Sequence, residues 1–447
     1  MFLGACRLSK CILTALVGLC SGAIFVSCGG SSSSNSFTSL HNRVLASQGV
    51  TASFSLGGLV VVDGKNDTLP RISPLNGGSS PRLIVLSPSR NIAATFDSGA
   101  SNVVAVNTST GNTIGSVHIP GPTSSLAVPS ASPTGYAAVP SAAVNGFAFL
   151  GAVEVLNFSS GSLLTIAASN AQTVVSNSQG TQLLVFSPDS DAVTVLFPGA
   201  ALPPVDTSCY TNPDNTNPPN STCKIVNDAR FSRPVNAIIN GTTAYILNCG
   251  VQCGGTQQAS VAIFDLGSLS ITQTVAVDAA TMALLNGSTL YVAGAPANFL
   301  CPASQKTAAT NCGTLDVVDL GSMQVTSSAV ITDGYHDRMD MTTNGQLFIG
   351  SRNCTNVGNV NVPTSGEIRG CLSIYKIADG SVIIPPDNGD VTGLQGFTTR
   401  NVEYVAEGGQ LRVYDTTKDI LLINDFVPQG TIDIVGFVGD VKAIDFF

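Results

Sequence analysis

Residues 244–277 read AYILNCGVQCGGTQQASVAIFDLGSLSITQTVAV and contain the pattern on which the rest of the chain is built. Residues 244–247 and 260–266 are short apolar runs, and residues 271–277 alternate apolar with polar side chains after a Gly-Ser turn. Short runs of this kind, bounded by turn residues, predict β-strands. With the preceding run at residues 234–240, the stretch predicts a unit of four strands.

The same four-strand order returns along nearly the whole chain, and its third strand, a V-x-V-x-D-like run, marks each copy. The eight third strands lie at residues 59–63, 103–107, 153–157, 192–196, 261–265, 315–319, 372–376 and 411–415. Successive copies are roughly 40 to 70 residues apart, a spacing typical of the blades of a β-propeller. No helical periodicity is found outside the first residues, so the sequence predicts an all-β chain.

The two ends of the chain predict how the ring closes. Residues 42–46, 59–63 and 71–75 form a blade that lacks its first strand, whereas residues 431–436 and 440–446 supply a last strand and one strand more. If the extra strand completes the N-terminal blade, no sheet edge is left open. We therefore expect a single propeller of eight four-stranded antiparallel blades. Seven blades are the alternative, because a long irregular stretch follows the fourth copy.

The copies resemble the bacterial YVTN-type β-propeller repeat, whose pattern is N-x-x-Y-V-x-N, a gap, V-x-V-x-D and a valine-rich strand. The matching residues are Tyr245, Ile246, Asn248, Val261, Ile263 and Asp265 in one copy, Tyr291, Val292, Val317 and Asp319 in the next, and Tyr404, Val405, Val413 and Asp415 in the last. The resemblance covers most of the chain from about Asn42 onward. It implies a propeller fold and indicates no reaction.

The first residues are typical of an export signal rather than of a folded segment. Arg7 and Lys10 give a basic start, an apolar run covers residues 11–26, and residues 25–28, FVSC, resemble the lipobox of bacterial lipoproteins. This resemblance implies that Cys28 carries a lipid. The alternatives are an ordinary signal peptide cut nearby and a retained transmembrane helix, for which the apolar run is short.

This assignment divides the chain into three parts. Residues 1–27 are the signal peptide, residues 28–41 are the lipidated cysteine and a Gly/Ser-rich linker, and residues 42–447 are the propeller. A linker of this composition is a flexible coil that holds a folded body off the bilayer. We therefore expect a monomer anchored to a bacterial membrane, in the periplasm or at the cell surface.

Composition argues against one large class of partners. The formal net charge is -9, and removing Arg7 and Lys10 with the signal takes it to -11. Nucleic-acid binding needs clustered basic residues, and the chain has no basic cluster, so no nucleic-acid partner is expected.

The twelve cysteines form two groups. Four lie in or at the end of the signal, and eight are neighbouring pairs: Cys209 with Cys223, Cys249 with Cys253, Cys301 with Cys312, and Cys354 with Cys371. Local pairs in an exported chain favour disulfides. A zinc site is not expected, because Cys249 and Cys253 have no second pair at metal spacing and no histidine beside them.

Three of the pairs share one topological position, between the second and third strands of consecutive predicted blades. In a four-stranded blade, that loop lies on the same face of the ring as the link to the next blade. The loops at residues 249–255, 296–313 and 353–370 should therefore crowd one sector of one face. One interpretation is that these loops form a binding rim, since long ordered loops on a rigid scaffold often bind ligands or partners. The alternative is that the disulfides only protect long loops from proteolysis.

The densest polar cluster, residues 333–338, lies between the last strand of one predicted blade and the first strand of the next. It should lie on the face of the stapled loops, near the central channel. Tyr335, His336, Asp337 and Arg338 are the candidate binding residues: His336 could act as a general base, and Arg338 could hold an anionic group. The alternative is a histidine that makes structural hydrogen bonds only.

The chain lacks most of the residues that known propeller enzymes use. The chain has no tryptophan, on which the cofactor of propeller quinoproteins generally stacks, and its glutamates lie at unrelated blade positions, so neither cofactor nor metal is expected. We expect a noncatalytic, lipid-anchored, extracytoplasmic propeller that binds a protein or envelope ligand through its disulfide-stapled face. One alternative is a lactonase-like hydrolase or lyase with a site near His336, an idea that rests on fold analogy. The other is a structural protein of the cell envelope.

Overall fold

The computed structural model describes residues 36–445, except 52–56, 131–132, 145, 200–201, 212–221, 302–310, 356, 359–367 and 386–388. The predicted signal, Cys28 and most of the predicted linker lie outside the described residues. A compact unit begins at Phe37, whose buried ring lies 4.5 Å from the guanidinium of Arg43, so packing starts shortly before residue 42. No helix among the described residues has the length and apolar character needed to cross a membrane.

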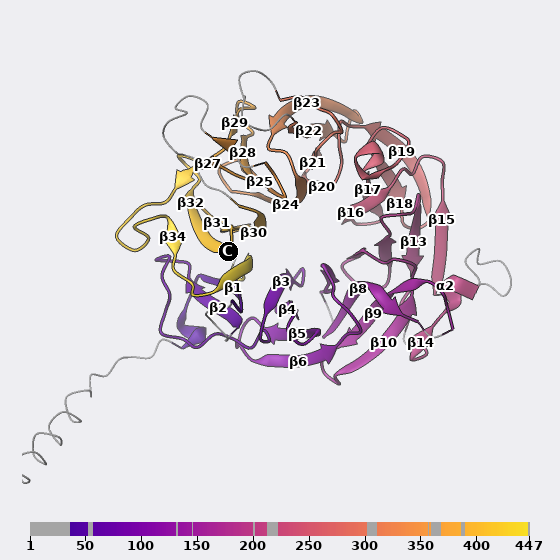
Figure 1. The fold of residues 1–447 in the computed structure, drawn as a ribbon, viewed down its shortest axis with the longest axis horizontal. Coiled ribbons are helices and arrows are strands. Elements are labelled where there is room, and N and C mark those ends of the chain that lie inside the picture. The colour runs from indigo at the N-terminus through magenta and orange to yellow at the C-terminus, as the bar shows by residue number, and fades with distance from the viewer. Residues whose placement is uncertain are drawn as a thin grey trace, which may run out of the picture. The chain divides into compact units, whose positions relative to one another are not determined.

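Eight sheets follow one another around a ring, and each is a blade of a β-propeller (Figure 1). Blade 1 consists of β35 (Phe437–Ala443), β1 (Arg43–Gly49) and β2 (Gly58–Asp63), and blade 2 of β3 (Pro81–Leu86), β4 (Ile92–Asp97), β5 (Asn102–Asn107) and β6 (Thr113–His118). Blade 3 consists of β7 (Ser125–Ala127), β8 (Thr134–Ala143), β9 (Leu150–Asn157) and β10 (Ser162–Ala167), and blade 4 of β11 (Thr173–Ser176), β12 (Leu183–Phe186), β13 (Ala192–Leu196) and β15 (Cys223–Asn227). Within each blade the strands are named from the channel outward.

The remaining blades continue this order. Blade 5 consists of β16 (Pro234–Asn240), β17 (Thr243–Asn248), β18 (Ser260–Asp265) and β19 (Ser270–Ala276), and blade 6 of β20 (Met282–Asn286), β21 (Thr289–Gly294), β22 (Gly313–Asp319) and β23 (Gln324–Ile331). Blade 7 consists of β24 (Tyr335–Met341), β25 (Gln346–Arg352), β28 (Leu372–Lys376) and β29 (Val382–Ile383), and blade 8 of β30 (Val391–Gly396), β31 (Val402–Glu407) and β32 (Gln410–Asp415), to which β33 (Ile420–Leu421) and β34 (Thr431–Ile432) both pair. The short elements are η1 (Phe37–Ser39), α2 (Ser208–Thr211), η2 (Gly250–Cys253) and the ribbon β26 (Val357–Gly358) with β27 (Ile368–Arg369).

The near-continuous apolar runs of the sequence arise because both faces of each blade are buried. On β18, Ala262 and Phe264 pack toward blade 4, whereas Val261 and Ile263 pack toward blade 6. Since successive side chains of a strand point to opposite faces, every residue in the middle of this strand enters one of the two layers between blades. The core is therefore a series of apolar layers around the ring.

The aspartate that ends the V-x-V-x-D pattern organises the turn to the outer strand. The carboxylate of Asp265 accepts hydrogen bonds from the backbone N–H and the hydroxyl of Ser268, at 2.6 and 2.8 Å. Asp319 accepts the same pair of bonds from Ser322, at 3.1 and 2.7 Å. These bonds favour the charged carboxylate and lower the pKa of both residues. The motif residue thus stabilises a turn and does not indicate a reaction.

The ring closes as predicted, through the C-terminal strand. β35 pairs antiparallel with β1, with Val44 opposite Ala443 and Ala46 opposite Val441. The expectation of eight blades is confirmed, but blade 1 has three strands rather than four. Its outer position is taken by residues 64–75, which touch β2 through two isolated bridges, because Pro70 and Pro74 cannot donate to a regular ladder.

The irregular stretch that suggested seven blades is an excursion within blade 4. After β13 the chain crosses to blade 3, where β14 (Val205–Asp206) adds a parallel strand beside β10. It continues through α2 at the outer edge of the ring (Figure 1) and returns as β15, the outer strand of blade 4. The disulfide between Cys209 and Cys223 joins the two ends of this return.

A buried ion pair joins blade 1 to blade 8 beside the closure. Arg400 donates to both carboxylate oxygens of Asp67 at 2.8 Å, and the Tyr404 hydroxyl donates to the same carboxylate at 2.5 Å. The side chain of Asp67 is only 2% exposed. Removing one member would leave a buried charge without its counter-ion, which usually costs more than the intact pair contributes.

We expect Arg400→Met to lower the free energy of unfolding by about 3 kcal/mol or more, because Asp67 stays buried without its counter-ion. Urea unfolding followed by circular dichroism measures the loss. Arg230→Met is the matched control: Arg230 also pairs with an aspartate, Asp228, but its side chain is 45% exposed, and unfolding should hardly change. Equal losses in the two variants would contradict a closing role for the buried pair.

Candidate binding site at the mouth of the central channel

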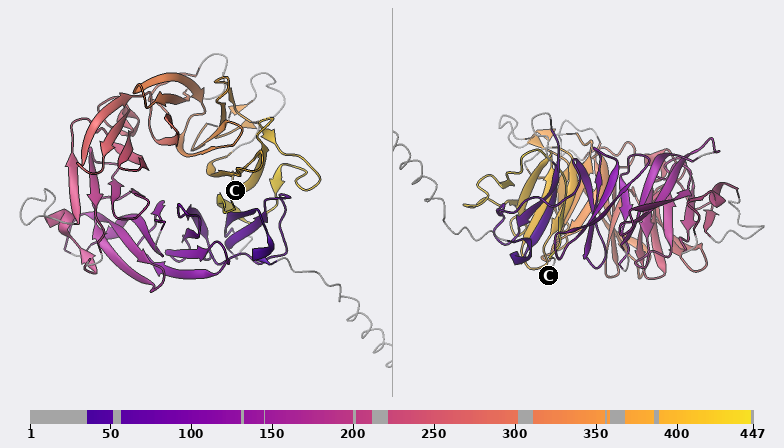
Figure 2. Two further views of the ribbon diagram at one scale, coloured as in Figure 1. Left: turned by 180° about the vertical axis from the view of Figure 1, so that it is seen from behind. Right: turned by 90° about the horizontal axis from the view of Figure 1, so that it is seen from below.

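The structure contains the four predicted disulfides, Cys209–Cys223, Cys249–Cys253, Cys301–Cys312 and Cys354–Cys371. The last three close the loops between the second and third strands of blades 5, 6 and 7, as the spacing of the repeats predicted. These loops lie on one face of the ring, together with the links from each blade to the next, because the strands of a blade alternate in direction. We call this face the disulfide face; the side view in Figure 2 shows the two faces of the ring edge-on.

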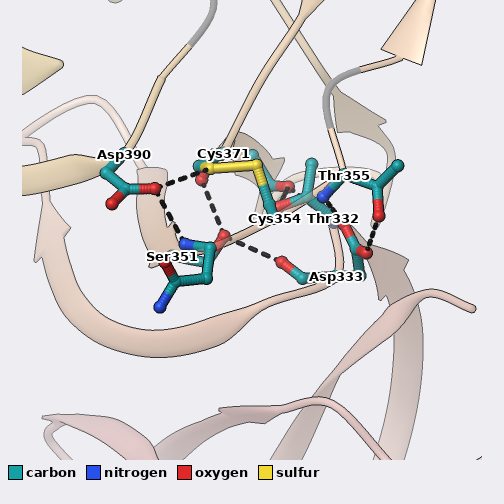
Figure 3. The surroundings of a disulfide bond; sticks show 9 residues. Thr332, Asp333, Ser351, Cys354, Thr355, Cys371 and Asp390 are labelled. Carbon is teal, nitrogen blue, oxygen red and sulfur yellow. Dashed lines mark hydrogen bonds between the residues drawn. A yellow bond between two sulfur atoms is a disulfide. The ribbon is translucent and has the colours of Figure 1, made fainter. Parts of the chain in front are cut away.

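Two aspartates hold the Cys354–Cys371 disulfide against the ring (Figure 3). The Asp333 carboxylate accepts hydrogen bonds from the backbone N–H and the hydroxyl of Thr355, at 2.9 and 2.7 Å. The Asp390 carboxylate accepts from the backbone N–H of Asn353 at 2.8 Å and lies 3.8 Å from the sulfur of Cys371. The described part of this loop is therefore attached to blades 7 and 8 at both sides of the disulfide.

A cavity of about 900 Å³ occupies the centre of the ring, and all eight inner strands contribute to its wall. Its half-buried apolar side chains include Leu83, Val85, Val175, Val235 and Met282. Its charged side chains are Arg82, Asp337, Arg338, Arg352 and Asp390. A volume of this size lies in the range of small-molecule sites in proteins.

Three of the four predicted binding residues line this cavity, namely Tyr335, Asp337 and Arg338. In a regular strand, Asp337 and Arg338 would point to opposite faces. A β-bulge between His336 and Arg338 shifts the pairing of β24 with β25, and both side chains enter the channel.

His336 does not line the cavity. Its side chain is fully buried between blades 6 and 7, and a Cβ built on Gly313 would lie 2.6 Å from its Cε1 atom. Burial lowers the pKa of His336 from 6.5 to about 4, with a smaller opposing effect from the backbone of Thr332. The imidazole is therefore a weak base, and because it is buried away from the cavity wall it does not reach a ligand in the channel. The structure gives no support to a catalytic site centred on His336.

The charges at the mouth form a small network on blades 7 and 8. Oδ2 of Asp337 lies 3.4 Å from Nη1 of Arg338 and forms a second ion pair with Nη2 of Arg352. Arg338 also donates from Nε to the Thr392 carbonyl at 2.6 Å. Arg352 is opposite Tyr335 in the ladder, at the ends of β25 and β24 that meet the disulfide face.

Sequence reasoning missed three residues of the mouth. Arg352 ends the second strand of blade 7, and Asp390 lies in the link just before β30. Arg82 lies on β3, where a bulge between Pro81 and Leu83 resembles that of β24. The signal that would have found Arg352 is its position, since the last residue of a second strand is a cross-strand neighbour of the first residue of the inner strand.

A second set of titratable groups lies near the opposite end of the channel and is built of buried carboxyl groups. Asp340 accepts hydrogen bonds from the Gly396 backbone N–H at 2.8 Å and the Gln395 side chain at 3.2 Å. Burial is the largest cause that raises the pKa of both Asp340 and Glu403, and the charge of Lys442 opposes it. Within the described part of the chain, no group of three or more His, Cys, Asp or Glu residues has the arrangement of a metal site.

Comparison with known proteins shows the fold and no more. No family model and no curated protein matches the chain in sequence. The structure is similar to that of the dihydro-heme d1 dehydrogenase NirN in complex with DHE, with a TM-score of 0.56 and 12% identity over 91% of this chain and 75% of that one. It is also similar to the Dos1 propeller, with a TM-score of 0.52 and 10% identity over 80% of this chain and 86% of that one. At such low identity, these likenesses say nothing about a shared ligand.

The burial of His336 predicts how stability depends on pH. Because the folded-state pKa of about 4 lies below the ordinary value of 6.5, its contribution is complete above pH 6.5 and is lost as the pH falls toward 4. His336→Phe should remove this part of the pH dependence, which amounts to about 3 kcal/mol at pH 4. Urea unfolding at several pH values between 4 and 7.5 checks it, and parallel pH profiles for wild type and variant would contradict it.

The disulfides of the face should stabilise the folded protein more where the loop that they close is longer, with a logarithmic dependence on loop length. Replacing both Cys354 and Cys371 by serine removes a bridge between residues 17 positions apart, and we expect the free energy of unfolding to fall by about 3 kcal/mol. The same change at Cys249 and Cys253 removes a bridge between residues 4 positions apart and should lower the free energy of unfolding by about 2 kcal/mol. Thermal unfolding under non-reducing conditions compares the variants. The reverse order would show that loop entropy is not the source of the stabilisation.

Proposed function

We propose that this propeller is a noncatalytic binding protein that presents its disulfide face to a protein or another component of the cell envelope. The observation that carries the proposal is the placement of three disulfides in the same loop of three consecutive blades. A propeller needs no such loops to close its ring. Long ordered loops on a rigid scaffold are a usual place for recognition.

Exposed apolar side chains on these loops support a protein partner. Val251 and Leu300 are 54% and 71% exposed, on the loops of blades 5 and 6. The two loops are linked, because Oε1 of Gln252 accepts a hydrogen bond from the Ala295 backbone N–H at 3.1 Å. A crevice of about 320 Å³ lies between them, lined by Cys249, Val251, Pro296 and Ala297 among others. Preformed apolar surface of this kind lowers the ordering cost of association.

The proposed location outside the cytoplasm is supported by the same cysteines. Disulfides persist in oxidising compartments and are rare in the cytosol. The lipobox-like residues 25–28 support a lipid on Cys28, which would tether the propeller to a bacterial membrane. A protein held there as a monomer, with one face rich in stapled loops, is suited to recruit a partner at the membrane surface.

The test introduces charge on the disulfide face and elsewhere. Leu300→Asp and Val251→Asp should abolish capture of a partner by chemical crosslinking in intact producing cells, because a carboxylate cannot be buried unpaired in an apolar contact. Ile423→Asp and Val205→Asp, which alter side chains that are 68% and 51% exposed on blades 8 and 3, are the matched controls and should leave capture unchanged. Quantitative mass spectrometry of the crosslinked species measures how much partner the face variants and the control variants capture.

Two outcomes of this experiment would overturn the proposal. If no specific crosslinked species forms with the wild-type chain, a structural role in the envelope explains the protein better. If the control variants lose the partner as completely as the face variants, the contact lies elsewhere on the ring. Circular dichroism of all variants verifies that the propeller is intact.

A further inference from the structure

The wall of the central cavity is divided into a charged part and an uncharged part. All its charged side chains come from blades 2, 7 and 8. Among the described lining residues, blades 3 to 6 contribute only hydroxyl, amide and apolar side chains, such as Ser125, Gln172, Val175 and Met282. A ligand in this cavity therefore meets charge on one side of the wall and an uncharged surface of hydroxyl, amide and apolar side chains on the other.

The charged part carries one excess positive charge. Three arginines, Arg82, Arg338 and Arg352, line the cavity with two aspartates, Asp337 and Asp390, which gives a formal charge of +1. Arg338 and Arg352 both pair with Oδ2 of Asp337, so one carboxylate serves two guanidinium groups. This local excess of positive charge contrasts with the formal charge of -9 for the whole chain.

The arginines are held in place before any ligand arrives. Arg338 donates to the carbonyls of Thr392 and Asp337, at 2.6 and 2.8 Å. Arg352 is 40% exposed at the mouth while its Nη2 is paired with Asp337. A guanidinium fixed at one edge and open at another is suited to a carboxylate, because its planar fork binds two oxygens together.

We propose that the cavity binds a small amphiphilic carboxylate, a molecule with one negative charge on a mainly apolar body. The carboxylate would lie at Arg352 and Arg338, and the apolar body would extend along Val85, Val175 and Met282. Val251 and Leu300, the residues that test partner binding, do not line the cavity, so the two proposals can be tested separately.

Other ligand classes fit the wall less well. A nucleotide or polyphosphate carries several negative charges, which a net charge of +1 would not balance. Flat heteroaromatic cofactors need stacking partners, and the aromatic side chains in the described wall are Tyr335 and Phe437. The ring of Phe437 is already covered by the guanidinium of Arg82, 5.1 Å from its centroid.

Isothermal titration calorimetry with three probes tests the site, using the whole chain without its predicted signal peptide. Octanoate supplies charge and apolar body, octanamide supplies the body without the charge, and acetate supplies the charge without the body. We expect saturable binding of octanoate at one molecule per chain, with octanamide and acetate weaker by at least about tenfold. No saturable octanoate binding, or octanamide binding equal to that of octanoate, overturns the proposal.

Variants locate the binding. Arg352→Gln should weaken octanoate binding by at least about tenfold, and Arg230→Gln, which alters an exposed arginine paired with Asp228, should leave it unchanged. Met282→Gln should weaken octanoate but not acetate. Leu300→Asp should still bind octanoate, so failure of the partner-binding proposal is distinguishable from failure of this one. Wild-type affinity in Arg352→Gln would overturn the assignment.

Discussion

Pairing between β1 and β35 is the constraint on which the rest of the structure depends. It joins the two ends of the chain within one blade, and the ion pair of Arg43 with Asp445 links residues 402 positions apart. Without it, blades 1 and 8 would expose the apolar layer that they now share, which includes Val44, Val441 and Tyr404. The central cavity depends on the same pairing, because β35 supplies part of its wall.

Much of the fold could be predicted from sequence because its determinants are local. Each blade buries both faces, so the third strands appear as apolar runs, six of which end in a turn-forming aspartate or asparagine, and counting them gave eight. The disulfide pairing followed for the same reason, since each bridge closes a short local loop. Blade 1 departed from the prediction of four strands, because residues 64–75 contain prolines that permit only isolated bridges.

The site was predicted less completely, for two physical reasons. The burial of His336 depends on contacts from the neighbouring blade, including Gly313, which no local pattern of polar residues shows. The orientation of Arg338 depends on a bulge that reverses the expected alternation of β24. Arg352 comes from a strand end and joins Asp337 and Arg338 through the pairing of β25 with β24. Asp390 comes from the link before β30 and joins them only when blades 7 and 8 are side by side.

The bulge of β24 has counterparts at similar positions on three other inner strands, between Pro81 and Leu83, Pro234 and Asn236, and Val391 and Gly393. On β3 and β16, as on β24, two consecutive residues reach the channel. Within these pairs, Leu83 and Val235 also pack against the apolar layers between blades, whereas Arg82, Asn236, Asp337 and Arg338 are the polar members of the wall. The chemistry of the channel can therefore be changed at the polar members while the apolar layers that hold the ring stay as they are. For protein engineering, the ring is a scaffold whose lumen can be varied at these polar positions.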